Sequence, residues 1–348
     1  MNIEQSADDT LDIEEFDYAG DVVLIVEGES PNAAKFLVSS KVLGLASPVF
    51  AALFSQNFSE GGQIIEGNRP EIMLRDDDPA AMRKILGILH YKGPGDEMDA
   101  KMLAALAIHC DKYNCIRALR PWIEIWLTSI GSMKATDDYG PLLLAAHFFR
   151  MPESFALVSS NAQKDLTPDV VLTWEVHEHL NLLPHCVIDD LIDGIERLLG
   201  YLHSEVQSVE GLIRECKARY VIEGLDCFRC GRSHPAQAKK CHPCNNTELH
   251  SKHCTVDSRV ADYFAILRHS ELWPSVIPFQ KFSVSDLAFG ISCANNDLKH
   301  SCGAWRCPLK QELDRLNQGV QKMVKEIRGF SLYPLHENLI DSGDKQLS

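Results

Sequence analysis

Positive charge is scarce in this chain and is missing altogether from its beginning. The 348 residues include 34 Lys and Arg against 49 Asp and Glu, so the formal net charge is -15. Residues 1–20 contain several acidic side chains and no basic one, and the first lysine is Lys35. A secretory signal peptide needs a positive start and an apolar core, so we expect none here. We predict instead that residues 1–17 form an acidic, disordered tail.

Long apolar runs are also absent. No stretch approaches the roughly 18 consecutive apolar residues that a membrane-spanning helix needs. An acidic surface gives no electrostatic attraction toward nucleic-acid phosphates or anionic lipid headgroups. We therefore expect a soluble protein of the cytoplasm, the nucleus or both. We expect no membrane partner, and nucleic acid is an unfavoured partner.

The motifs of common enzyme classes are missing too. Zinc hydrolases use H-E-x-x-H, which His177-Glu178-His179 does not match. Zinc deaminases need H-x-E with P-C-x-x-C, and Pro243-Cys244 has no second cysteine at the right place. The chain has no Gly-rich phosphate loop and no nucleophile elbow. We expect a protein that is not an enzyme and has no catalytic residue.

Residues 21–58 carry the clearest positive signal. A short, uncharged run of β-branched and leucine side chains favours a strand, because branched Cβ atoms pack well on a pleated surface. A second short strand should follow a turn around Gly28 and Pro31, and then two helices, each opened by a capping serine. The predicted elements are strands at Val22–Val26 and Phe36–Val38, a helix at Lys41–Leu45 capped by Ser39 or Ser40, and a helix beginning at Ser47 and Pro48.

This order of elements resembles the start of the BTB (POZ) domain, over about residues 18–127. The resemblance is carried by Asp21, the runs Phe36–Leu43 and Ala46–Phe50, Phe54, Phe58–Glu60, Ile72–Leu74, Asp76–Pro79 and Ile85–Tyr91. Ile72–Leu74 matches the family's third strand, and Ile85–Tyr91 matches a helix that ends in a Tyr-containing turn. The chain departs from the family at Ser39 or Ser40, where a His is usual, but a serine can also cap the helix.

The resemblance implies an α+β domain, here residues 18–130, that self-associates as a homodimer and often recruits a partner. In the family, Asp21 and Lys41 would lie close together in a charged pocket at the dimer interface. Members that act as ubiquitin-ligase adaptors bind a cullin scaffold through a region that corresponds here to Pro79–Tyr91. A cullin scaffold and a client protein of unknown identity are thus candidate partners.

The rest of the chain is predicted to be mostly helical. We expect helices at Ala100–Tyr113, Ile116–Ser129 with a late start or a kink at Pro121, Tyr139–Arg150, Ser154–Asn161, Thr167–Trp174, about Val187–Tyr220 and Pro308–Arg328. The corresponding segments are a helical region at 131–223, a Cys/His-rich segment at 224–307, a C-terminal helix within 308–340 and a tail at 341–348.

Twelve cysteines are many for an intracellular chain, and eight of them lie between 227 and 307. Cys227 and Cys230 form one C-x-x-C pair, and Cys241 and Cys244 form a second after ten intervening residues. Two such pairs can supply four thiolates to one tetrahedral ion, so we predict a structural Zn²⁺ site. Disulfides, free surface thiols and a redox-active C-x-x-C are weaker alternatives. A redox motif needs a preceding strand, whereas we expect a helix to end near Gly224.

A second metal site is a further, weaker prediction. Its candidate ligands are His253, Cys254, Cys293, Cys302 and Cys307, with His234, His242 and His300 nearby. The long Cys-rich extension resembles those of fungal BTB proteins. The preferred hypothesis is a protein–protein interaction module, and the alternative is a zinc-dependent transcriptional or nucleic-acid-binding regulator.

Overall fold

The computed structural model describes residues 12–27, 33–93, 95, 98–130, 135–177, 179–274, 276–298, 300, 302 and 307–332. The predicted tail over residues 341–348, most of the predicted acidic tail and the predicted turn at Gly28 and Pro31 lie outside these residues. The chain divides into two compact units. The front unit comprises residues 1–159, 173–185 and 329–348, and the rear unit comprises residues 160–172 and 186–328.

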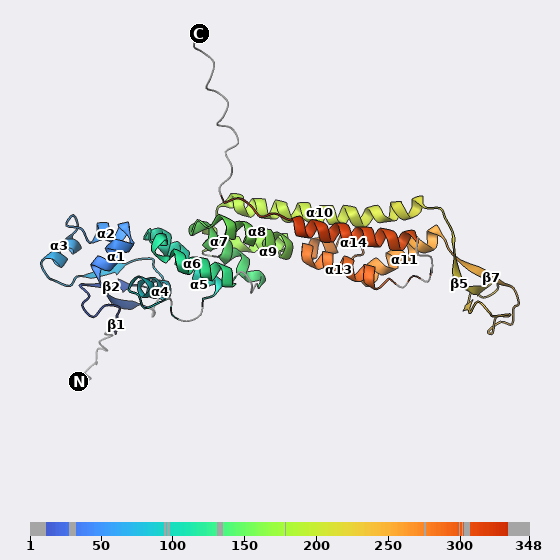
Figure 1. Ribbon diagram of the computed structural model, residues 1–348, viewed down its shortest axis with the longest axis horizontal. Coiled ribbons are helices and arrows are strands. Elements are labelled where there is room, and N and C mark those ends of the chain that lie inside the picture. Colours follow the sequence, from blue (N-terminus) through green and yellow to red (C-terminus); the bar gives the residue numbers. More distant parts are fainter. Residues whose placement is uncertain are drawn as a thin grey trace, which may run out of the picture. The chain divides into compact units, whose positions relative to one another are not determined.

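A four-stranded sheet with the order β1-β3-β2-β4 begins the front unit (Figure 1). Its strands are β1 (Ile13–Glu15), β2 (Val22–Val26), β3 (Ala34–Val38) and β4 (Glu71–Leu74). Strand β2 pairs antiparallel with β3 and parallel with β4, so Leu24 lies between Phe36 and Ile72. Strand β1 pairs parallel with β3. Residues 13–15 therefore belong to the sheet and not to the predicted acidic tail.

Helices α1 to α3 lie between β3 and β4 in the sequence, and α4 follows β4. They are α1 (Ser40–Ala46), α2 (Pro48–Leu53), α3 (Ser59–Ile65) and α4 (Pro79–Leu89). The Ser39 hydroxyl caps α1, and the Ser47 hydroxyl accepts a hydrogen bond from the Phe50 N–H at 3.0 Å to cap α2. Pro48 occupies the first turn of α2, where its missing N–H has no helical partner to lose. Both predicted serine caps are confirmed.

Further helices complete the front unit. They are α5 (Ala100–Lys112), α6 (Ile116–Ile130), the short η1 (Thr136–Asp138), α7 (Tyr139–Phe148), η2 (Thr173–Val176) and η3 (Leu180–Leu182), with the first part of α8 (Pro152–Asp165). Asp99 caps α5 through the N–H of Met102. Helix α6 begins at Ile116 and continues through Pro121, so of the two predicted alternatives, a late start or a kink at Pro121, the late start is wrong. Helix α7 is apolar and buried nearly all round.

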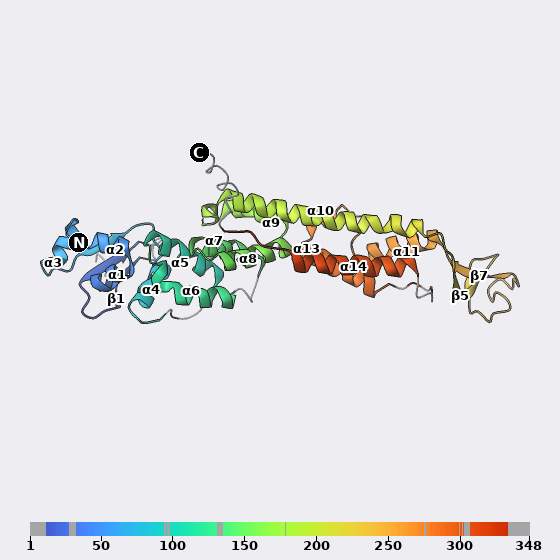
Figure 2. The ribbon, with the colours of Figure 1, turned by 45° about the horizontal axis from the view of Figure 1, so that its top comes forward.

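The rear unit is built on a long helix, α10 (His185–Glu215), which Figures 1 and 2 show running beside α14 (Pro308–Glu326). Its other helices are α9 (Pro168–Leu172), α11 (Val256–His269), α12 (Pro278–Lys281) and α13 (Val284–Asn296). Apolar residues three and four apart on α10 and α14 are buried, as their periodicity predicts. Helix α14 ends at Glu326, two residues before the predicted end.

A three-stranded sheet of order β6-β5-β7 corrects the prediction for the end of α10. Its strands are β5 (Tyr220–Cys227), β6 (Ser233–His234) and β7 (Leu249–Cys254), all antiparallel. The helix expected to reach Tyr220 ends at Glu215, and the next residues enter β5. Residues 220–227 form a strand because they pair with β7, which lies far away in the sequence. The helical periodicity of the preceding residues does not indicate this pairing.

Candidate metal centres and interaction surface

The first thiol cluster, called here the four-cysteine cluster, consists of Cys227, Cys230, Cys241 and Cys244. Their Sγ atoms all lie within 4.8 Å of one another. The separations are 3.5 Å for Cys227 and Cys244, 3.4 Å for Cys230 and Cys241, and 3.6 Å for Cys230 and Cys244. A Zn²⁺ ion with Zn–S bonds of about 2.3 Å would separate its sulfurs by about 3.8 Å. The cluster is therefore close to the size of a tetrahedral site.

Two turns of the same design bring these sulfurs together. The Gly231 N–H donates to the Cys227 carbonyl, and the Asn245 N–H donates to the Cys241 carbonyl, both at 2.8 Å. Gly231 and Asn245 have φ angles of 67° and 56°. This left-handed backbone suits glycine and asparagine better than most residues. Each turn folds its C-x-x-C pair toward one point.

The protonation of these thiols depends on burial and on local donors. Burial raises the pKa of Cys227, but backbone N–H groups of Cys230 and Arg229 and the neighbouring thiols outweigh burial and lower it to about 6. Burial and hydrogen bonds with the other thiols raise the pKa of Cys241 to about 12. Near neutral pH the Cys227 thiol thus favours its thiolate form, while the Cys241 thiol retains its proton. Zn²⁺ binds thiolates, so it would have to displace the proton that Cys241 retains, and four sulfur ligands favour Zn²⁺.

The second thiol cluster, called here the Cys₃His cluster, consists of Cys254, His300, Cys302 and Cys307. The Cys254 Sγ lies 3.3 Å from His300 Nε2 and 4.0 Å from the Cys307 Sγ. Cys254 ends β7, and Cys307 stands at the N-terminal cap of α14. Within the described chain, these two groups of four are the ones arranged to hold a metal ion, and neither shares a residue with the other.

The composition of the Cys₃His cluster differs from the predicted second site at three residues. His253 and Cys293 are outside the cluster, and His300 is inside it. Successive side chains of a strand point to opposite faces, so His253 cannot face the same point as Cys254 on β7. The His253 ring is exposed, and its Nδ1 lies 2.8 Å from the Ser251 carbonyl oxygen. His234 and His242 also lie outside both clusters.

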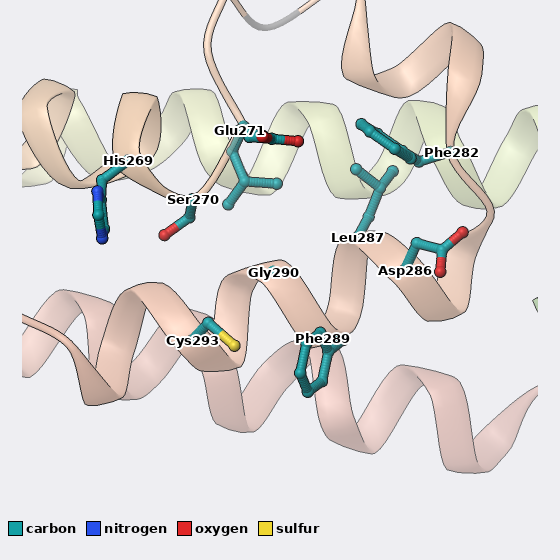
Figure 3. A pocket seen from close by; sticks show the side chains of 10 residues that line it. His269, Ser270, Glu271, Phe282, Asp286, Leu287, Phe289, Gly290 and Cys293 are labelled. Carbon is teal, nitrogen blue, oxygen red and sulfur yellow. The ribbon is translucent and has the colours of Figure 1, made fainter.

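Cys293 lies on α13 and lines a pocket of about 380 Å³ (Figure 3). The pocket is bounded by the end of α11 and by α13, with His269, Leu272, Phe282 and Leu287 among its residues. Figure 3 shows Cys293 and Phe289 along one helix and His269 and Ser270 across the gap. Cys293 is close in sequence to the ligands of the Cys₃His cluster, but its position on α13 places its side chain in this pocket and outside the cluster.

Two charged residues that the sequence did not single out lie against the Cys₃His cluster. Asp262 Oδ2 is 2.8 Å from His300 Nδ1. Arg259 is fully buried, and its guanidinium lies 3.5 Å from the Cys254 Sγ while also donating to the carbonyls of Cys216 and Ala218. Both come from α11. Arg259 lies on the buried side of this helix, whereas the Asp262 side chain is 47% exposed, so helical periodicity could have indicated Arg259 alone.

Disulfides and a redox-active C-x-x-C are alternatives to metal binding by these cysteines. All twelve cysteines lie in the described part of the chain and each is free there. The prediction that a helix, and not a strand, precedes Cys227 is wrong, because β5 leads into this residue. A turn and β6 follow Cys230, however, where a redox motif of that kind would have a helix.

The two predicted interface residues of the front unit, Asp21 and Lys41, differ in their contacts. The Asp21 carboxylate accepts hydrogen bonds from the Ser40 N–H at 2.7 Å and from the Ser40 hydroxyl at 2.6 Å. Lys41 is exposed at the start of α1, and the described residues include no ion pair between it and Asp21 within one chain. Nearby, Leu45 is 84% exposed and Val49 is 40% exposed. We call Lys41, Leu45 and Val49 the α1–α2 surface.

The segment predicted to meet a cullin scaffold is largely part of the core. Most residues of α4 are buried, including Met82, Ile85 and Leu86. Arg83 is exposed and pairs with Glu14 at 2.7 Å. Tyr91, which follows α4 with a φ of 61°, is 94% exposed. The parts of this segment that a partner could reach therefore include the Arg83 side chain on α4 and the Tyr91 ring at the end of the segment.

Comparison with known proteins identifies one region. Residues 13–126 match the family model described as the BTB/POZ domain. No curated protein matches the chain. None of the helices in the described part of the chain is both long and apolar enough to cross a membrane.

Proposed function

Because residues 13–126 form a BTB/POZ domain, we propose that this protein is a non-catalytic interaction module that pairs with a second copy of itself. BTB/POZ domains are generally interaction modules, and the metal-binding geometry of the rear unit fits a structural role. A closed set of four protein ligands leaves no open position for a reacting water. The thiols need a reducing compartment such as the cytoplasm or nucleus to stay free for metal.

The observation that carries self-association is the α1–α2 surface. Leu45 and Val49 expose apolar area on either side of the Ser47 cap, and Lys41 places a charge beside them. Exposed leucine and valine next to a charge are typical of an interface with an apolar centre and a polar rim. Asp21 contributes to this surface indirectly, because its carboxylate accepts hydrogen bonds from Ser40, the first residue of α1. A stable dimer would bury about 1,600 Å² in total.

We infer further that the four-cysteine cluster binds a structural Zn²⁺ ion. Its Sγ separations of 3.4 to 3.6 Å and its two matched turns support this metal. Of the three strands beside it, β6 has only two residues and β7 carries mostly polar side chains. Such a small sheet has little apolar core of its own, so a metal would be the main source of its stability.

A role as a cullin-type ubiquitin-ligase adaptor is a more specific form of this proposal. The exposed side chains of the candidate segment Pro79–Tyr91 include Arg83 and the ring of Tyr91. A pull-down with purified cullin scaffold proteins tests this role, with Tyr91→Ala expected to reduce capture. Equal capture of the wild type and the variant would remove Tyr91 from the contact, and absence of capture by the wild type would remove the adaptor role.

A nucleic-acid-binding regulator is the second candidate function, and one observation favours it. Arg229, Arg232, Lys239 and Lys240 are all exposed in the loops around the four-cysteine cluster, beside Phe228, which is 77% exposed. Cationic and aromatic side chains together suit a single-stranded nucleic acid. The overall net charge of -15 opposes this function. Filter binding that weakens steeply with added salt would support it.

Co-capture of two differently tagged copies tests the proposed self-association. The wild-type pair should be captured together, and Leu45→Glu in both copies should weaken capture about 10-fold or more, because a charge would be buried at the interface. Ile65→Glu is the matched control, since Ile65 is 61% exposed on α3. Full capture of the Leu45→Glu pair would show that the α1–α2 surface does not mediate pairing.

A further inference from the structure

We propose that the Cys₃His cluster is a second, independent zinc site, in which Cys254, Cys302, Cys307 and the Nε2 atom of His300 bind one Zn²⁺ ion. The site goes beyond the proposed interaction function, because it concerns how the rear unit is held together. Four ligands from three chain segments meet at this point, while the four-cysteine cluster draws all of its ligands from one short stretch.

The distances suit a tetrahedral ion. A Zn²⁺ ion bonded at about 2.3 Å to sulfur and about 2.0 Å to nitrogen separates two sulfurs by about 3.8 Å and a sulfur from a nitrogen by about 3.5 Å. Cys254 and Cys307 have a Sγ separation of 4.0 Å, and the Cys254 Sγ lies 3.3 Å from His300 Nε2. All four ligand atoms lie within 4.8 Å of one another. A small ion fits at their centre without any large movement.

Asp262 orients His300 as a ligand. The Asp262 carboxylate lies 2.8 Å from Nδ1, so the proton of a neutral imidazole resides on that nitrogen and donates to the carboxylate. The lone pair of Nε2 then faces the sulfurs. Metal-binding histidines commonly make this carboxylate contact, which fixes the tautomer and strengthens the ligand. Asp262 is thus a positioning residue for the site.

Arg259 adds a second supporting contact. Its guanidinium is fully buried and lies 3.5 Å from the Cys254 Sγ. Three thiolates and one neutral histidine around a divalent ion leave a net charge of about -1. A buried negative charge needs a nearby positive partner, and Arg259 is the one that the fold supplies. The buried arginine is therefore explained by a charged site at Cys254.

The site has a clear structural consequence for α14. Cys307 is the N-terminal cap residue of α14, but it makes no side-chain capping hydrogen bond. Bound metal would fix the start of this helix to the end of β7 through Cys254. Arg259 also donates to the carbonyls of Cys216 and Ala218, just after α10. Metal binding would thus join the C-terminal helix, the small sheet and the end of the long helix.

Metal stoichiometry of the purified full chain tests the proposal. Plasma mass spectrometry should find two zinc ions per wild-type chain. Cys307→Ser and His300→Ala should each reduce this number by one, and the paired change Cys230→Ser with Cys241→Ser should leave one ion in the Cys₃His cluster. Cys293→Ser and His253→Ala are matched controls, one thiol and one imidazole outside the cluster, and both should retain two ions.

A variant that replaces one metal ligand by another separates the loss of a ligand from a failure of the chain to fold. His300→Cys should still bind two ions, and the spectrum of its cobalt-substituted form should gain sulfur-to-cobalt charge-transfer intensity relative to the wild type. One zinc ion in the wild type that survives Cys307→Ser would overturn the proposal. A cobalt spectrum of His300→Cys identical to that of the wild type would overturn the assignment of His300, and a Cys254–Cys307 disulfide in the non-reduced protein would overturn the metal site.

Competition with a chromogenic chelator tests the role of Asp262. Asp262→Asn should still bind two ions but should hold one of them about 10- to 100-fold less tightly, because the imidazole loses its orienting carboxylate. Asp257→Asn makes the same charge change at an exposed position of α11 and should leave both affinities unchanged. Equal affinities in Asp262→Asn and the wild type would remove Asp262 from the site.

Discussion

The carboxylate of Asp21 accepts two hydrogen bonds from Ser40, at 2.7 Å from its N–H and at 2.6 Å from its hydroxyl. Asp21 lies just before β2, and Ser40 is the first residue of α1. This pair therefore fastens the entry of the central strand to the helix that carries the α1–α2 surface. A negative charge at the N-terminus of a helix is also favoured by the helix dipole.

Replacing Asp21 should loosen α1 without unfolding the chain. Asp21→Ala removes a charge-assisted pair of hydrogen bonds, which should lower the local opening free energy of α1 by about 1–3 kcal/mol. Hydrogen exchange measured by mass spectrometry on the peptide that contains Ser40–Ala46 reports this change. Lys41→Ala serves as the control and should change the opening free energy by less than about 0.5 kcal/mol, since Lys41 is exposed. Unchanged exchange in Asp21→Ala would mean that Ser40 is held by other contacts.

A second prediction concerns the buried carboxylate of Asp77. The Tyr113 hydroxyl donates to Asp77 Oδ2 at 2.5 Å, and the Tyr113 ring stacks on Phe50 with centroids 4.5 Å apart. Tyr113→Phe keeps the ring but leaves Asp77 with one donor fewer, so the free energy of unfolding should fall by about 1–3 kcal/mol. Urea denaturation measures the loss. Tyr91→Phe removes a hydroxyl from an exposed ring and should be neutral; an equal effect of both changes would contradict the account.

His90 should make the front unit less stable in acid. Burial lowers the pKa of His90 by more than the hydrogen bond to the Leu86 carbonyl raises it. Its Nδ1 lies 2.8 Å from that carbonyl oxygen, and its Nε2 accepts the Ser39 N–H at 3.1 Å, so the folded state holds the neutral ring. The unfolded chain binds the proton more strongly, and stability should therefore fall as pH drops below about 6.5, through the lowered folded pKa.

Urea midpoints recorded above and below that pH test the role of His90. His90→Gln offers no titrating ring and should show a smaller loss of stability in acid than the wild type. His185→Gln is the control, because its side chain is exposed, and it should lose stability in acid as the wild type does. The prediction fails if the His90→Gln and wild-type midpoints fall in parallel.

Loss of the four-cysteine cluster should unfold only the small sheet of the rear unit. A structural Zn²⁺ ion contributes on the order of 10 kcal/mol to the folding of such a site near neutral pH. Cys227→Ser with Cys244→Ser should therefore make residues 220–254 sensitive to protease and leave the front unit resistant. Cys186→Ser, a change at an exposed cysteine on α10, should keep native resistance. Native resistance in the double variant would contradict a structural metal.

Much of the front unit follows from local chemistry, which explains why the sequence predicts it well. Ser39, Ser47 and Asp99 each cap a helix through their own side chains, and the β-branched run of β2 pairs on both sides. The two C-x-x-C pairs are equally local, since Gly231 and Asn245 supply the backbone that each turn needs. The match of residues 13–126 to the BTB/POZ family model agrees with this part of the prediction.

The rest depends on residues that only the folded chain brings together. Strand β5 exists because it pairs with β7, more than twenty residues later, so its own sequence could be read as the continuation of α10. His300 joins Cys254 across 46 residues, and Asp262 meets His300 across 38. The sequence predicts Cys302 and Cys307 as ligands, but it places His300, two residues before Cys302, only near the site. Alternation along β7 would have separated His253 from Cys254.

Sedimentation velocity of the wild-type chain at micromolar concentration tests the central claim most directly. The account predicts the mass of a dimer, and Leu45→Glu should shift the distribution toward the monomer while Ile65→Glu should not. A wild-type chain that sediments strictly as a monomer across the micromolar range would contradict the proposed self-association.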